Sequence, residues 1–142
     1  MTEMEILNGV TITLSKEVSE EFFYNSLCNA LGSGYMSGYG LELETDEEEY
    51  KQSKKNWQEK NPNQTCCYED VLMQMLKDGY KLTFVDNECE GEYTRSITLK
   101  DVHEKVQNAP IRFLNDMIQQ NDDAETADVI LQTVFFDDII FG

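Results

Sequence analysis

The chain has 142 residues, of which 28 are acidic and 11 are lysine or arginine, so its formal net charge is −17. Hydrophobic residues make up 40% of it and aromatic residues 11%, which excludes a disordered acidic tail. No apolar run approaches the roughly 20 residues that a membrane-spanning helix needs. The length fits a single domain over residues 1–142, with enough apolar side chains to form a core.

The charge also restricts the partners that the chain can bind. Phosphate contacts need clustered lysines and arginines, and here carboxylates outnumber these cations by more than two to one. We therefore expect no direct binding to nucleic acid and none to a membrane, whereas a basic protein is a fitting partner. Residues 1–5 are acidic and no long apolar stretch follows them, so we expect no secretory signal and a cytoplasmic location.

The predicted elements begin with a strand over residues 10–14, where apolar residues alternate with threonine. Residues 18–31 carry apolar residues at helical spacing, and Gly32 is the predicted cap at the end of that helix. Residues 32–40 contain four glycines, which predicts an irregular connection instead of a helix. A short strand is predicted over residues 39–44.

A polar segment over residues 45–62 follows, and it predicts an exposed helical insertion. Thr45, with Glu48 three residues later, matches a capping box at its start. Its acids come first and its lysines later, an order that suits the helix dipole. The next stretch predicts, in order, a helix over 65–78, a strand over 81–85, a turn over 87–91 and a returning strand over 93–99.

The C-terminal third predicts three more helices and an apolar tail. Thr98 and Asp101 form a second capping box, and Pro110 suits the first residue of the next helix. A final helix begins near Ala124, after an acidic break. Residues 139–142 are too apolar to extend into solvent. We expect them to pack on the sheet or on a second copy of the chain. The fold class is therefore α+β, with a small antiparallel sheet of three to four strands packed against four to five helices.

Two acidic regions are candidate binding surfaces. The first places six carboxylates in eight residues: Glu42, Glu44, Asp46, Glu47, Glu48 and Glu49. The second comprises Asp116, Asp122, Asp123, Glu125, Asp128, Asp137 and Asp138. Carboxylates on a rigid surface can imitate DNA phosphates and occupy a DNA-binding protein by the same electrostatics. The alternative interpretation is a solvated surface that keeps the protein in solution.

The glycine- and tyrosine-rich segment is a second candidate site. Its members are Gly32, Gly34, Tyr35, Gly38 and Tyr39. Glycines let a backbone approach a ligand closely, and tyrosines can stack on a base, so the segment could form one wall of a nucleotide pocket. It lacks the lysine and hydroxyl residue of a phosphate-binding loop. The alternative is a connection whose two tyrosines are anchored in the core.

The remaining reactive side chains predict no enzyme. The cysteines are Cys28, Cys66, Cys67 and Cys89, with no CxxC pair among them, and His103 is the single histidine. We therefore predict free thiols, no metal and no cofactor. His103 lies on a predicted helix and is expected at the surface. No nucleophile-elbow, metalloprotease or deaminase pattern appears.

Four blocks of the chain together resemble a group of small acidic proteins of phages, prophages and conjugative elements of gut bacteria. They are residues 29–35, 76–79, 121–132 and 139–142, and the likeness covers roughly residues 20–142. The most specific block is Asn-Asp-Asp-Ala-Glu-Thr-Ala-Asp-Val-Ile-Leu-Gln at 121–132. The resemblance implies a genetic setting, in a bacterial host cell, in which small accessory proteins counter host defence.

Three functional hypotheses follow. The first is a non-enzymatic accessory protein that binds a basic host protein, such as restriction or CRISPR machinery, through acidic surfaces that mimic DNA. The second is a protein that sequesters a nucleotide signal with the glycine- and tyrosine-rich segment. The third is a structural accessory protein that acts as a homo-oligomer through its apolar C-terminus.

Overall fold

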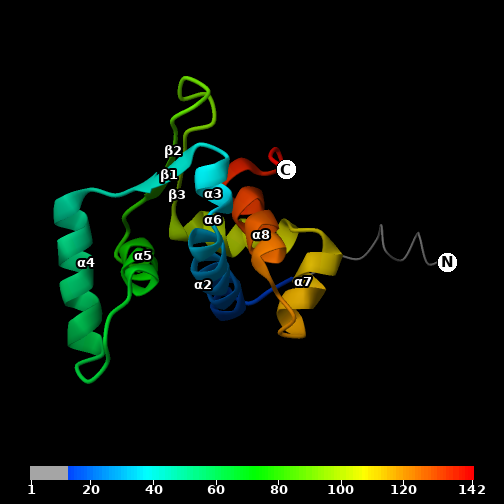
Figure 1. Ribbon diagram of the computed structural model, residues 1–142. Helices are drawn as coiled ribbons and strands as arrows, with labels where there is room; N and C mark the ends of the chain where they lie inside the picture. The colour runs from blue at the N-terminus through cyan, green and yellow to red at the C-terminus, as the bar shows by residue number, and fades with distance from the viewer. Residues whose placement is uncertain (1–12) are drawn as a thin grey trace.

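The computed structural model describes residues 13–142, without the side chains of residues 32 and 33. Most of the strand predicted over 10–14 lies outside this range, and Thr13 and Leu14 are not in a strand. The described residues form an α+β fold with seven α-helices and a three-stranded antiparallel sheet (Figure 1). The predicted fold class is therefore confirmed, with more helices than the expected four to five.

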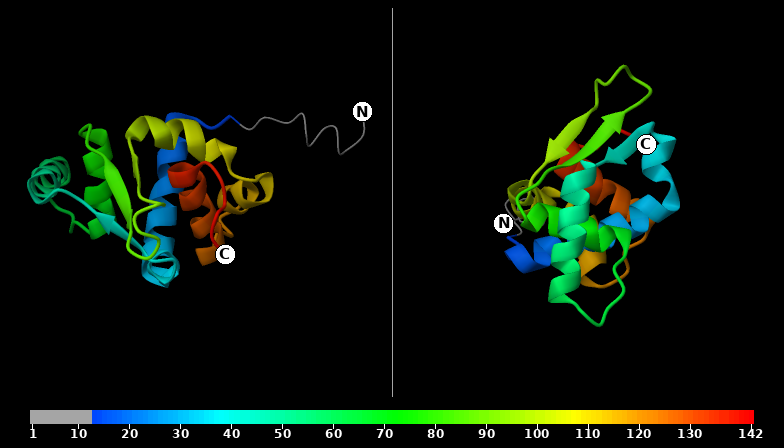
Figure 2. Two further views of the ribbon diagram at one scale, coloured as in Figure 1. Left: turned by 90° about the horizontal axis from the view of Figure 1, so that it is seen from above. Right: turned by 90° about the vertical axis from the view of Figure 1, so that its left-hand side faces the viewer.

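Five helices follow one another across the molecule in the order α4, α5, α2, α8, α7 (Figures 1 and 2). Their bounds are Glu47–Lys60 for α4, Tyr68–Lys77 for α5, Lys16–Ser33 for α2, Ala124–Phe136 for α8 and Ile111–Ile118 for α7. The most extensive contact joins α2 to α8, where Phe23 and Leu27 are fully buried. Every residue of α8 from Thr126 to Phe135 is buried, because this helix is covered by α2, α7 and the sheet.

The sheet has the order β1-β2-β3, with strands Leu41–Glu44, Leu82–Asp86 and Arg95–Ile97. Phe84, on the central strand, pairs with Leu43 on one side and Arg95 on the other. Its ring meets the ring of Phe135 edge-on at 4.4 Å, which fixes the sheet on α8. Leu82, Phe84 and Asp86 are buried in alternation with half-buried neighbours, as expected of a strand with one face on the core.

The hairpin is confirmed, but β3 is shorter than the predicted strand. Asp86 accepts backbone N–H groups of Glu88, Cys89 and Tyr93, and this draws residues 87–94 into a long turn. The bond from Cys89 is foremost among those that hold the pKa of Asp86 below its ordinary value. At the other end Thr98 leaves the sheet to cap α6, Leu99–Lys105.

The glycine-rich segment contains a helix, so the prediction of an irregular connection over residues 32–40 is wrong. Helix α2 runs on through Gly32 to Ser33 and ends at Gly34, whose φ of 83° needs no side chain. The next four residues, Tyr35–Gly38, form the short helix α3. One left-handed glycine is enough to end α2, and the other glycines do not prevent a helical turn.

Local capping explains most of the remaining boundaries. Asp46, and not Thr45, caps α4, because its carboxylate accepts the Glu49 N–H at 3.0 Å. Thr98 caps α6, as predicted, and Asp123, in the acidic break before the last helix, caps α8. Pro110 lies one residue before α7, and α5 begins at Tyr68, later than predicted. A 3-10 turn over Val106–Asn108 follows α6.

Gln132, which is fully buried on α8, ties the C-terminal tail to the core. Its amide oxygen accepts the N–H groups of Ile140 and Phe141, both at 2.8 Å. Its amide nitrogen donates to Asp128 at 3.0 Å and to the Phe141 carbonyl at 3.2 Å. The ring of Phe141 also stacks on Tyr39 at 4.8 Å. The tail thus packs on its own chain, between α8 and the segment that follows α2.

Candidate functional site

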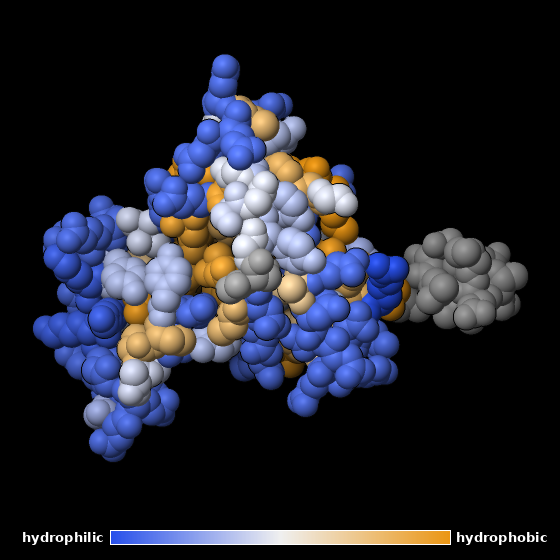
Figure 3. Space-filling model, in the orientation of Figure 1, coloured by the Kyte–Doolittle hydropathy of each residue, from blue (hydrophilic) through white to orange (hydrophobic). Residues whose placement is uncertain are grey.

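The first predicted acidic region forms an exposed surface over β1 and the start of α4. Glu42 and Glu44 alternate with Leu41 and Leu43 and point away from the core. Glu47 and Glu48 are exposed, with Lys51 as the cation that contacts both. Figure 3 shows hydrophilic residues covering α4 and the end of the hairpin. Asp46 caps its helix, so its carboxylate is partly occupied by the backbone.

The structure adds acids that the sequence reading missed. Glu88, Glu90 and Glu92 are exposed on the turn between β2 and β3. This turn lies against β1, because Asn87 donates to Glu42 at 3.2 Å. The sequence signal was two acids, Glu88 and Glu90, in the predicted turn over residues 87–91, with Glu92 directly after it. We call Glu42, Glu44, Glu47, Glu48, Glu88, Glu90 and Glu92 the acidic face.

The second predicted acidic region contains both partnered and exposed carboxylates, and the fold does not bring the start of α8 to the acidic face. The start of α8 lies at the opposite end of the molecule from the hairpin (Figures 1 and 2). Asp122 accepts from Asn29, Glu125 pairs with Arg112, and Asp137 pairs with Lys105. The Thr126 N–H bonds to the carboxylate of Asp123 and, with further donors, lowers its pKa.

Asp128 is not part of any surface, and its assignment to this acidic region is wrong. It is 7% exposed and accepts from Gln132 and from the Tyr39 hydroxyl, the latter at 2.8 Å. Its place on the buried face of α8 could not be read from its charge. A buried carboxylate with two donors is a structural group.

Tyr39 packs against the core, whereas Tyr35 is exposed, so the alternative interpretation of the glycine- and tyrosine-rich segment holds for one of its two tyrosines. Its ring lies between Phe141, at 4.8 Å, and Tyr35, at 6.5 Å. A groove near this segment is lined by Gly34, Met36 and Ser37, and neither tyrosine lines it. Gly32 and Gly38 belong to helices α2 and α3. A nucleotide ligand at this segment stays a prediction.

Tyr39 should make stability fall at alkaline pH. Burial, and next the hydrogen bond to Asp128, raise the pKa of Tyr39 from 10.0 to about 12. The folded state favours the neutral phenol of Tyr39. The contribution of this phenol to the free energy of unfolding is therefore complete below pH 10 and is lost as the pH rises through about 12. The difference in free energy of unfolding between the wild type and Tyr39→Phe should therefore narrow across this window. Denaturant titrations at several pH values measure it, with Tyr80→Phe as control, and a constant difference would contradict it.

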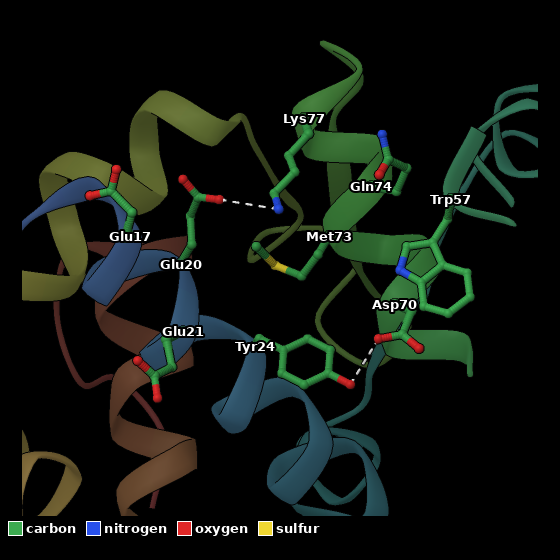
Figure 4. A pocket seen from close by; sticks show the side chains of 9 residues that line it. All are labelled: Glu17, Glu20, Glu21, Tyr24, Trp57, Asp70, Met73, Gln74 and Lys77. Carbon is green, nitrogen blue, oxygen red and sulfur yellow. Dashed lines mark hydrogen bonds and ion pairs between the residues drawn. The ribbon is translucent and has the colours of Figure 1, made fainter. Parts of the chain in front are cut away.

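A cleft of about 360 Å³ opens between α2, α4 and α5 (Figure 4). It is lined by Glu17, Glu20, Glu21, Tyr24, Trp57, Asp70, Met73, Gln74 and Lys77. Helix α5 supplies the floor, because it lies between the other two helices. The sequence reading singled out none of these residues as a site. Their only sequence signal was Trp57, an aromatic residue in an otherwise polar helix.

The cleft carries four carboxylates and one lysine. Glu20 contacts Lys77 at 3.6 Å and the His103 ring at 2.8 Å, so the prediction of His103 as a simple surface residue is wrong. Tyr24 donates to Asp70 at 2.9 Å, and burial followed by its hydrogen bonds raises the pKa of Tyr24 well above its ordinary value. Burial opposes ionisation of Asp70, but its hydrogen bonds with Cys67 and Tyr24 prevail and lower its pKa.

Two properties of the described residues bear on function. Over residues 13–142, no three His, Cys, Asp or Glu side chains are arranged to hold a metal ion. None of the described helices has both the length and the apolar character that crossing a membrane requires. Ile139 and Ile140 are both 41% exposed, and homo-oligomerisation through the C-terminus stays a prediction.

Comparison of the chain with protein-family models, with curated proteins and with solved structures finds no match. The resemblance to proteins of phages and other mobile elements therefore stays a prediction.

Proposed function

We propose that the chain is a non-enzymatic accessory protein that binds a basic, DNA-binding partner through the acidic face. In this proposal it acts in the cytoplasm of a bacterial host, where it counters a defence protein by occupying the surface that would bind DNA. The acidic face is the observation that supports the proposal. It gathers carboxylates of β1 and the start of α4, which are close in the sequence, with those of a hairpin turn that is distant in the sequence.

A binding surface differs from an acidic surface that only keeps a protein in solution in that its carboxylates are held in fixed positions. Glu42 and Glu44 are held at strand spacing by the pairing of β1 with β2. The Asn87 bond holds the turn against the same strand. Fixed carboxylates lose little freedom on binding, so they can match the cations of a DNA-binding surface at low entropic cost.

Charge reversal tests the proposal. The quadruple variant Glu42→Lys, Glu44→Lys, Glu47→Lys, Glu48→Lys should lose inhibition of DNA cleavage, measured over a panel of restriction and Cas nucleases. The matched control reverses four acids on other surfaces, Glu104, Asp116, Glu125 and Asp138. Its net charge is the same as that of the first quadruple variant. The control should inhibit like the wild type, because the arrangement of the acids and not the total charge carries the binding.

Salt provides the second readout. Inhibition by the wild type should weaken between about 0.1 M and 1 M salt, as the Debye length falls from about 10 Å to about 3 Å. Duplex DNA should compete with it for the same nuclease. Inhibition by no nuclease of the panel, an equal loss in both quadruple variants, or binding that does not respond to salt would each overturn the proposal.

A further inference from the structure

We propose that the open edge of β1 is the docking site for an extended, basic segment of the partner, which joins the sheet as a further antiparallel strand. Cationic and apolar side chains alternate along this segment. The inference rests on the proposed function, because that function supplies the basic partner. It adds the way in which the partner chain is held, through backbone groups and an apolar groove that the carboxylates of the acidic face do not include.

β1 is an edge strand of the sheet. Among the described residues the strand order is β1-β2-β3, so β2 is the one strand that pairs with β1. The Asn87 N–H donates to the Gly40 carbonyl at 2.8 Å, directly before β1 begins. Hydrogen-bonded positions alternate along an antiparallel pair, and therefore Glu42 and Glu44 also direct their backbone groups to β2.

Leu41 and Leu43 direct their backbone N–H and C=O groups to the other, open side of β1. Within residues 13–142, no hydrogen bond of these groups is found. A row of unpaired donors and acceptors at a sheet edge is a template for another strand. An extended segment at this edge satisfies them as β2 satisfies the groups on the opposite side.

A groove of about 410 Å³ lies beside the open edge. Its lining includes Leu41, Leu43 and Phe84 of the sheet, Met36 of α3 and Tyr68 of α5. Figure 3 shows hydrophobic surface at this place, between α3 and the start of α5. Side chains of a strand point alternately to the two faces of the sheet, so every second side chain of the added segment enters the groove. Apolar side chains fit this lining.

The other side chains of the added segment meet carboxylates. Glu42 and Glu44 are exposed on the outer face of β1, and neither forms an ion pair with a cation of the described residues. Opposite charges on neighbouring strands stabilise the pairing, and like charges destabilise it. A second copy of this chain at the edge brings its own Glu42 and Glu44 against these carboxylates. The charges therefore favour a basic segment as the occupant.

The probe for this site is the blocked peptide acetyl-Lys-Val-Lys-Val-Lys-amide. It is titrated into the full chain while the backbone amide signals are followed by NMR. The signals of Leu41 and Leu43 should shift in a saturable way, because their N–H groups gain acceptors. Peptides with glutamate or with threonine in place of each lysine should bind at least about tenfold more weakly.

Backbone methylation identifies the groups of the peptide that are bonded. Residues directly opposite each other in an antiparallel pair share a face, so the valines lie opposite Leu41 and Leu43 and donate to them. N-methylation of both valines should weaken binding at least about tenfold. N-methylation of two lysines, whose N–H groups face solvent, should leave binding unchanged. An equal or larger loss on methylation of the lysines would overturn the proposal.

Leu43→Pro closes the edge from the side of the protein. It removes the outward N–H and no hydrogen bond to β2, which is the position that a proline tolerates on an edge strand. Leu43→Ala is the matched control, because it also loses the leucine side chain but retains the N–H. The proline variant should bind the lysine peptide at least about tenfold more weakly than the alanine variant. The amide signals of β2 show whether both variants fold alike, and if the proline variant does not, the methylated peptides decide the question.

Charge variants test the preference for a basic segment. Glu42→Gln with Glu44→Gln should weaken the lysine peptide at least about tenfold. Glu104→Gln with Glu125→Gln has the same net charge and should bind like the wild type. Equal losses in these two variants, or equal binding of the glutamate peptide, would overturn the proposal. So would shifts of the two leucine signals with protein concentration alone, because the occupant would then be a second copy.

Failure of this proposal can be distinguished from failure of the proposed function. If the lysine peptide does not bind while the wild type inhibits a nuclease, the docking edge is wrong and the proposed function stands. The same conclusion follows if Leu43→Pro inhibits that nuclease as strongly as Leu43→Ala, since both variants retain every carboxylate of the acidic face. If the peptide binds at β1 while no nuclease is inhibited, the edge stands as a site for basic strands and the defence role is wrong.

Discussion

Replacing Gln132 by leucine is expected to lower the free energy of unfolding by about 3–4 kcal/mol, since it removes four hydrogen bonds worth about 1 kcal/mol each. Leucine keeps roughly the volume of the side chain, so the loss reflects hydrogen bonding more than a cavity. The N–H groups of Ile140 and Phe141 lose their acceptor, and the buried Asp128 loses one of its donors. Denaturant unfolding measures the loss.

The tail should detach in this variant before the rest of the fold opens. Phe141 would keep its ring contacts with Tyr39, but its backbone would no longer be held. Hydrogen exchange at Ile140 and Phe141 should therefore become fast. The matched control, Gln52→Leu, changes an exposed glutamine on α4 and should stay within about 0.5 kcal/mol of the wild type. If Gln132→Leu and Gln52→Leu lower the free energy of unfolding equally, Gln132 does not anchor the tail.

Replacing Asp78 is expected to cause the second largest loss in the free energy of unfolding, because its carboxylate joins α4 to α5. It accepts from Ser53 at 2.8 Å and Asn56 at 3.0 Å, both on α4, and from Gln74 at 2.7 Å. Hydrogen bonds to a charged group contribute about 1.5–3 kcal/mol each. Because the Asp78 carboxylate is half-buried, solvent weakens these bonds, and Asp78→Ala should lower the free energy of unfolding by about 3 kcal/mol. Amides of α4 should lose protection in hydrogen exchange more than those of α8.

The pH dependence identifies the charged form of Asp78 as the acceptor. Burial raises its pKa, but the hydrogen bonds from Asn56, Ser53 and Gln74 prevail, so its pKa is lower than the ordinary value of 3.8. Its contribution is complete above that value and is lost as the pH falls through the lower folded pKa. The stability difference between the wild type and Asp78→Asn should therefore be constant near neutral pH and shrink below about pH 4.

A control separates this contact from a general effect of charge. Asp116→Ala removes a carboxylate of α7 that makes no hydrogen bond or ion pair with another described residue. It should change the free energy of unfolding by less than about 0.5 kcal/mol. If Asp116→Ala costs as much as Asp78→Ala, or if the Asp78→Asn difference persists in acid, then the link between α4 and α5 is not the source of the effect.

Helices with strong local signals could be predicted closely from the sequence. The stripe over 18–31 and the caps at Thr98 and Asp123 depend on neighbours three or four residues away, so the sequence contains the information. The end of α2 was misplaced because two glycines, Gly32 and Gly34, can each provide the left-handed residue, and only the packing selects between them.

The candidate sites could be predicted only in part. The acids of β1 and α4 could be found because they are consecutive and exposed. Glu88, Glu90 and Glu92 join them only through the pairing of the hairpin with β1. The cleft was missed entirely, since Trp57, Gln74 and Glu20 come from three helices and no short-range pattern relates them.

The sequence by itself determined the α+β class, most helix positions and the strong negative charge, because composition, periodicity and capping act over a few residues. The tertiary structure alone decided which charges face water. Asp128 is buried and accepts a hydrogen bond from Tyr39. Asp78 accepts hydrogen bonds from side chains of two helices. Glu17 and Glu21, in contrast, are exposed and line the same cleft as Trp57. The physical reason is that burial and pairing of a carboxylate depend on residues distant in the chain, which only packing brings within hydrogen-bonding distance.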